Sequence, residues 1–166
     1  MLPNMLIVAL AALVPLVMGF IYYNPNVLGK AWMKLSGMTE EKMKEGNMAV
    51  IYISAYVLSF LVALALFGAV VHQTAYYSIL INEPGFGEEG SDIMNQMGAF
   101  MDAYGNNFRT FQHGALHGGL IGVFLALPVL MTNGLFEGKG FKYGFLNAGY
   151  WIITFALMGG ILCQWA

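Results

Sequence analysis

Two histidines stand one helical turn apart in the segment FQHGALHGGLIG, residues 111–122. This spacing places His113 and His117 on one face of a helix, as a metal site built on a helix requires. His72, the remaining histidine of the chain, follows an earlier apolar run. Imidazole nitrogens bind zinc, copper and nickel, and two histidines from different helices can hold a haem. The sequence therefore indicates His72, His113 and His117 as candidate ligands of a divalent metal or a haem.

A ridge of glycines gives the same histidines two other interpretations. Gly114, Gly118 and Gly122 recur every four residues, and small residues at this spacing allow close contact between helices in a membrane. His113 and His117 flank this ridge. They would then hydrogen-bond across a helix interface, or respond to pH, without binding a metal. Both interpretations stay open beside the metal site.

The motifs of common catalytic sites are missing. The sequence contains no HExxH or CxxC motif, no Ser-His-acid arrangement can be argued, and Cys163 is its one cysteine. The net charge is −2, with no basic stripe of the kind that binds nucleic acid. We therefore expect neither an enzyme nor a nucleic-acid-binding protein.

The elements that would position these histidines are membrane helices. Apolar residues make up 58% of the chain and charged residues 10%, whereas a soluble domain carries about 25% charged residues. Four runs without Asp, Glu, Lys or Arg are long enough to cross a bilayer: 5–23, 48–71, 114–135 and 143–165. Each must be a helix, because lipid offers the backbone no hydrogen bonds. We expect an all-α fold, one membrane domain over residues 1–166 with four transmembrane helices.

The lysines predict how this domain is oriented. The connecting segments 24–47 and 136–142 hold all the lysines, whereas segment 72–113 holds only Arg109. By the positive-inside rule, the two lysine-bearing segments are cytoplasmic and both termini lie outside. We expect a multi-pass protein of the cytoplasmic (inner) membrane, with all three histidines at its outer interface.

Two connecting segments are predicted to contain helices of their own. In the inner segment 24–47, apolar residues recur at helical spacing with lysines opposite, and Thr39 caps a second short helix, so we expect an interfacial helix pair. In the outer segment 72–113, an amphipathic helix is expected to start at Ser91. It would lie on the outer surface or against the bundle, and its apolar stripe is Ile93, Met97, Phe100, Tyr104, Phe108 and Phe111.

A weak internal repeat is also visible. Residues 23–34, YNPNVLGKAWMK, align without gaps with residues 132–143, TNGLFEGKGFKY, and the helices before them carry Pro15 and Pro128. This similarity predicts a 2+2 pseudo-repeat. The composition shared by all interfacial segments is the other explanation.

Residues 19–41, GFIYYNPNVLGKAWMKLSGMTEE, resemble the first-loop signature of a family of small bacterial four-helix membrane proteins, a domain of unknown function. The second half is similar to the same family through NGLFEGK (133–139), NAGY (147–150) and MGGIL (158–162). The resemblance implies a four-span fold and supplies no reaction. The long segment 72–113 departs from the family's usual compact form.

These observations favour a structural or accessory membrane protein without catalytic machinery. Its partners would be the lipid bilayer and either further copies of itself or a larger membrane complex. One alternative is an oligomeric pore or small-solute channel with a polar ring of Asn24, Asn133 and Asn147, residues that would otherwise bond to neighbouring backbone. The other alternative is a metal- or haem-binding membrane protein that uses the outer histidines.

Overall fold

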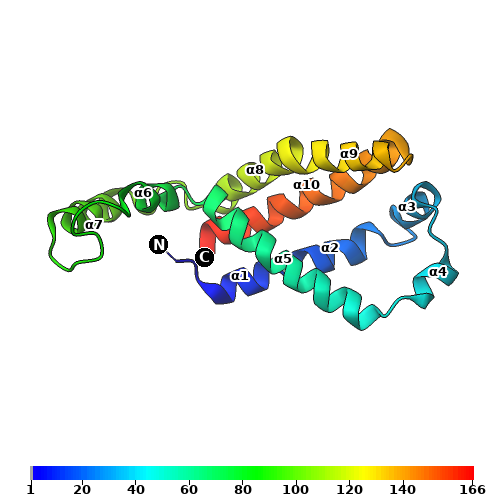
Figure 1. Ribbon diagram of the computed structural model, residues 1–166, viewed down its shortest axis with the longest axis horizontal. Helices are drawn as coiled ribbons and strands as arrows, with labels where there is room; N and C mark the ends of the chain where they lie inside the picture. The colour runs from blue at the N-terminus through cyan, green and yellow to red at the C-terminus, as the bar shows by residue number, and fades with distance from the viewer. Residues whose placement is uncertain (1) are drawn as a thin grey trace.

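Four helical spans run along the long axis of the molecule in the computed structural model, which describes residues 2–166 (Figure 1). The first span is α1 (Met5–Ala11) followed by α2 (Val14–Tyr22), and the second is α5 (Met48–Val70). The third consists of α8 (Phe111–Ile121), the π-helical η1 (Gly122–Ala126) and α9 (Leu127–Phe136), and the fourth is α10 (Gly140–Trp165). All four are long and apolar enough to cross a membrane. The predicted all-α fold with four spans is confirmed.

Helix caps explain where the spans begin. The Asn47 side chain accepts a hydrogen bond from the Val50 N–H at the start of α5, and Thr110 accepts one from the His113 N–H at the start of α8. These bonds satisfy amide groups that a helix leaves without a partner in its first turn. The cap at Thr110 starts the third span three residues earlier than predicted, which brings His113 inside the helix.

In each half of the predicted repeat, the first helix is interrupted next to a proline. The first span breaks between α1 and α2, and Pro15 lies in the first turn of α2. The third span changes to a π-helical turn in η1, directly before Pro128. Proline lacks the N–H that would continue the helical ladder, so an interruption here is expected. The aligned segments differ, however, because 23–34 leads into a separate short helix and 132–143 leads into α10. The repeat stays a prediction.

Helix α10 is the centre of the bundle and contacts all the other spans. Its closest neighbour is α8, which approaches through the predicted glycine ridge. A Cβ atom built at Gly114 would collide with the Gly159 backbone oxygen, and one built at Gly118 would collide with the Phe155 backbone oxygen. The backbones are therefore in direct contact, as small-xxx-small helix pairs allow.

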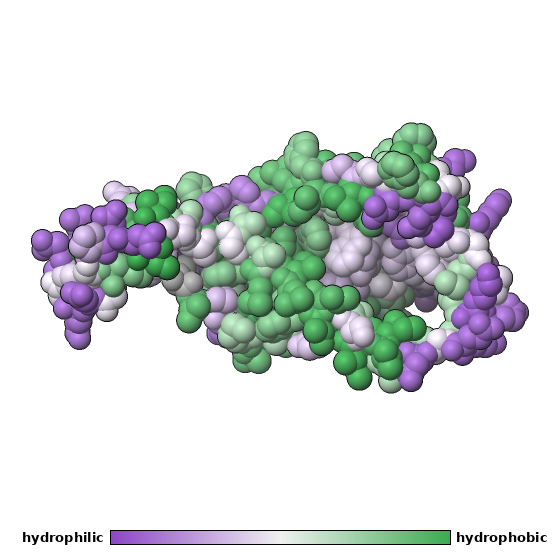
Figure 2. Space-filling view, viewed as in Figure 1, coloured by the Kyte–Doolittle hydropathy of each residue, from purple (hydrophilic) through white to green (hydrophobic). Residues whose placement is uncertain are grey.

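The two ends of the bundle differ. The end that carries His72, His113 and His117, here called the histidine end, contains the buried cluster of Val8, Phe67, Val70, Met158 and Leu162. The opposite end, here called the lysine end, carries α3 (Gly29–Ser36), α4 (Glu40–Glu45) and the turn from α9 to α10. An apolar girdle separates the polar tips of the two ends, as expected for a protein that spans a bilayer (Figure 2). The predicted helix pair in segment 24–47 corresponds to α3 and α4.

An arm of two helices extends beyond the histidine end (Figure 1). It consists of α6 (Gln73–Leu80), which the sequence analysis did not anticipate, and α7 (Asp92–Tyr104), the predicted amphipathic helix. The predicted apolar stripe was too long, because the helix ends at Tyr104 and Phe111 starts α8. The Tyr76 and Phe100 rings stack with their centroids 4.2 Å apart, so α7 packs against α6.

Candidate metal centre

His72 occupies the junction between α5 and α6. Helix α5 ends at Val70, Val71 adopts an extended conformation, and His72 starts the turn that leads into α6. The change in chain direction leaves the His72 ring exposed at the end of the second span.

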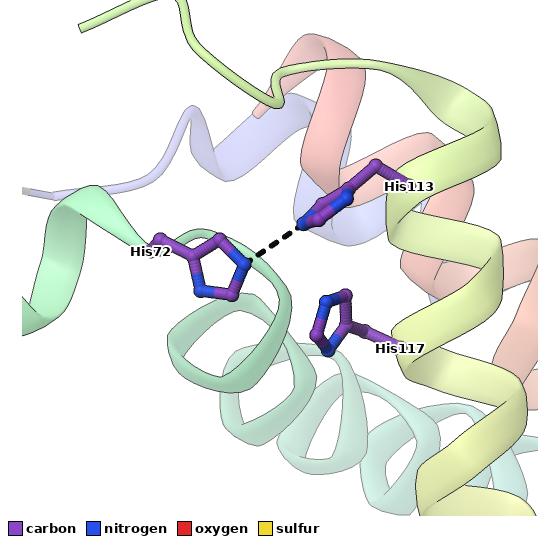
Figure 3. A group of neighbouring side chains, drawn as sticks. All are labelled: His72, His113 and His117. Carbon is purple, nitrogen blue, oxygen red and sulfur yellow. Dashed lines mark hydrogen bonds between the residues drawn. The ribbon is translucent and has the colours of Figure 1, made fainter. Parts of the chain in front are cut away.

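His113 and His117 lie on α8 beside the glycine ridge. The ridge faces α10, so residues one position before it face the neighbouring side of the helix. Both rings point from there toward His72 and are partly buried (Figure 3). The sequence prediction that the three histidines share one end of the bundle therefore agrees with the structure, which in addition brings their rings into contact.

The three rings form one compact cluster. The Nε2 atoms of His72 and His113 are 2.8 Å apart, within hydrogen-bond distance. The centroid of the His117 ring lies 4.9 Å from that of His72 and 4.5 Å from that of His113. One nitrogen from each ring can be chosen so that all three lie within 4.8 Å of one another. Within residues 2–166, no carboxylate or thiol joins this group.

These separations suit a metal ion after small side-chain rotations. Nitrogen ligands lie about 2.0–2.1 Å from zinc, which separates two ligands of a tetrahedral site by about 3.3 Å. The His72–His113 pair is slightly closer than this, and the widest separation in the cluster is larger. Three protein ligands would leave a fourth position for water or a small molecule.

An aromatic pocket adjoins the cluster on the side of the arm. It has a volume of about 430 Å³ and shares His72 with the cluster; its other lining residues are Gln73, Tyr76, Phe100, Tyr104, Asn107 and Phe108. The Phe108 ring lies against His113, with centroids 5.1 Å apart, and edge-on to His72. The histidines therefore have an apolar aromatic wall on one side.

Gln73 fixes the arm next to this wall. Its side chain is buried, and its amide nitrogen donates hydrogen bonds to the carbonyl oxygens of Gly105 and Asn107. These bonds join the start of α6 to the segment that follows α7. The sequence did not indicate this role, although the position of Gln73 directly after His72 was visible.

Two polar residues at the end of α10 have structural roles nearby. The Cys163 thiol donates to the carbonyl oxygens of Val70 and Phe108 at 3.4 and 3.3 Å. The Gln164 side-chain oxygen accepts a hydrogen bond from the Phe111 N–H at the start of α8. Both side chains tie α10 to its neighbours instead of pointing into the histidine cluster.

The asparagines considered for a pore are partly engaged within the chain. The Asn147 side chain accepts a hydrogen bond from the Tyr23 hydroxyl and donates one to the Tyr143 carbonyl. Asn24 accepts a hydrogen bond from the Asn26 N–H. Asn133 is exposed. Asn24 and Asn147 thus bond to neighbouring groups, which is the alternative to their forming the polar ring of a pore.

Comparison with known proteins places this architecture in a family without an assigned activity. The model of a family described as "Protein of unknown function (DUF1761)" matches residues 6–163, a range that covers the arm and nearly all of the four spans. No curated protein matches the chain, and no solved structure matches it. The predicted resemblance to a family of unknown function is confirmed, and the chain belongs to the protein family DUF1761.

Proposed function

We propose that this protein is a membrane protein that binds one transition-metal ion through His72, His113 and His117. The observation that carries the proposal is the convergence of three imidazoles, from the α5–α6 junction and from α8, within 4.8 Å. Histidines are uncharged metal ligands at neutral pH, and the set is typical of zinc, copper, nickel or cobalt sites. A shared structural role is weaker as an explanation, because only one hydrogen bond joins the three rings.

The contact between the rings favours an ion over a haem. A haem held by two axial histidines would have to lie between two of these rings. The rings are instead packed against one another, with centroid separations of 4.5–4.9 Å. A single ion needs only the small central space that the ring nitrogens already surround.

Orientation gives the proposed site its biological setting. With the lysine end in the cytoplasm, the histidine end and both termini lie on the outer side of a cytoplasmic membrane. The site would then take up its ion from the outer side. An accessory role in a larger complex, or self-association, is compatible with such a site and remains the prediction made from the sequence.

Metal binding is tested on the detergent-purified protein after treatment with a chelator. We expect about one Zn²⁺, Co²⁺ or Cu²⁺ ion per chain, measured by equilibrium dialysis and elemental analysis. The visible spectrum of the Co²⁺ form reports the coordination number. Each of His72→Ala, His113→Ala and His117→Ala should weaken binding more than about tenfold, the smallest effect typical of residues that merely support a ligand.

The matched control is Gln112→Ala, which removes an exposed polar side chain next to His113. Its metal affinity should equal that of the wild type. Substoichiometric binding by the wild type, or an ion retained when all three histidines are replaced, would overturn the proposal. A Soret band in the purified protein that is lost in the histidine variants would replace the ion by a haem.

A further inference from the structure

The bundle opens into a large cavity at the lysine end. It has a volume of about 1020 Å³ and is lined by residues of α2, α3, α4, α5 and α10. Ligand pockets in proteins usually measure about 300–1,000 Å³. The surface is hollowed beside α4 in Figure 2, and the buried core lies at the other end of the bundle. The spans therefore pack tightly at the histidine end and separate toward this cavity.

The inner wall of the cavity suits an apolar chain. Leu16, Phe20, Ile51 and Ala55 contribute hydrocarbon from α2 and α5. Two polar groups of the wall are already bonded within the protein: Tyr23 donates to the Asn147 side-chain oxygen, and Tyr150 donates to the Pro15 carbonyl. An apolar occupant would leave none of these groups without its partner.

The mouth of the cavity has a different chemistry. Lys42 of α4 is the charged residue in its lining, and Trp32 of α3 also lines the cavity. A second cavity of about 470 Å³ shares Trp32 with the first and adds Lys44 and Glu40. Lysine attracts anionic headgroups, and tryptophan is favoured at the level of lipid headgroups. With Lys42 as the charged residue of its lining, the mouth of the first cavity therefore suits a negatively charged group connected to the apolar chain inside.

We propose that this cavity binds an anionic phospholipid, with an acyl chain between α2 and α5 and its phosphate group beside Lys42. The bilayer is the source of this occupant, because the cavity lies between membrane spans and its mouth is formed by the short helices at their polar end. The inference does not depend on the histidine cluster, which lies at the opposite end of the bundle.

Native mass spectrometry of the full chain in detergent tests this site. Phosphatidylglycerol and phosphatidylcholine with identical acyl chains are the two probes. We expect one retained phosphatidylglycerol per chain and weaker retention of phosphatidylcholine. Lys42→Gln should reduce the affinity for phosphatidylglycerol about fivefold, the factor that about 1 kcal/mol per lysine represents. Lys34→Gln, which removes an equal charge from α3 outside both cavities, should have no such effect.

Filling the cavity provides a second, independent test. Ala55→Phe places a ring inside the cavity, whereas Ala65→Phe adds the same ring to the exposed surface of α5. We expect Ala55→Phe to lose the retained phosphatidylglycerol and Ala65→Phe to keep it, with both variants folded by circular dichroism. Equal retention of the two lipids by the wild type would overturn the proposal. So would an unchanged affinity in both Lys42→Gln and Ala55→Phe.

Discussion

Phe108 has a strained backbone conformation and lies beside the histidine cluster. Its φ angle is 62°, and no other non-glycine residue in the range 2–166 has a positive φ. The left-handed conformation costs an L-residue about 1–2 kcal/mol. The Phe108 carbonyl accepts hydrogen bonds from the Thr110 N–H and the Cys163 thiol, which hold this conformation in place. This left-handed conformation places the Phe108 ring beside His72 and His113.

Two substitutions at Phe108 distinguish the effect of backbone strain on stability from the effect of losing the ring. Phe108→Ala and Phe108→Gly both remove the ring, but only the alanine keeps a Cβ atom in the left-handed conformation. We expect the glycine variant to be more stable than the alanine variant by about 1 kcal/mol, because glycine adopts a positive φ without strain. Thermal unfolding in detergent measures the difference. An alanine variant at least as stable as the glycine variant would show that φ at this position carries no strain.

The sequence predicted the candidate ligands, but only part of their geometry. His72, His113 and His117 were predicted at one depth because the order of the spans determines which end of the bundle each residue occupies. Contact between their rings depends on two further details: α5 stops at Val70, and α8 starts at the Thr110 cap. The strained Phe108 was read as part of a helix, since hydrophobic spacing does not show where a helix ends.

The glycine ridge of α8 is the element that sets the distance between the third and fourth spans. Gly118 faces the backbone of α10 so closely that a Cβ atom would collide with the Phe155 carbonyl. Gly119, the next residue, faces a looser region, where a Cβ atom would lie 3.8 Å from the Ala156 Cβ. Adjacent glycines in one helix therefore have opposite requirements.

This contrast gives a matched pair of substitutions. Gly118→Ala should destabilise the protein by about 1–3 kcal/mol, the usual cost of overpacking, because it pushes α8 away from α10. Gly119→Ala should stabilise it by about 0.5–1 kcal/mol, because alanine favours the helix and its methyl group fits. Thermal unfolding in detergent measures both. Similar effects of the two substitutions would contradict backbone contact along the ridge.

At the level of elements, composition predicted more than local spacing did. The four spans follow from long runs without charge, because lipid permits only a helix there, and the helices begin and end within about three residues of those runs. Helix α6 was missed because Gln73–Leu80 is short and mixes polar with aromatic residues. The π-helical turn in η1 was missed because no sequence pattern distinguishes it from the α-helix around it.

The two ends of the molecule's long axis differ in packing and in chemistry. Its histidine end combines a close-packed core, the histidine cluster and the projecting arm, whereas its lysine end combines a cavity with the lysine side chains. A metal ion would be bound where the bundle is closely packed, and a lipid where the spans separate. The orientation of this axis in the membrane therefore decides which side of the cell each site serves.

Cysteine labelling determines that orientation. Gln96→Cys places a thiol on the exposed surface of α7 and Glu45→Cys places one at the end of α4, while native Cys163 is buried. The lysines near Glu45 predict that this residue is cytoplasmic, because positively charged segments are retained in the cytoplasm. In intact bacterial spheroplasts, a membrane-impermeant maleimide should label the Gln96→Cys protein and should label Glu45→Cys only after permeabilisation. The wild type is the background control, and the reverse pattern would place the histidine cluster in the cytoplasm.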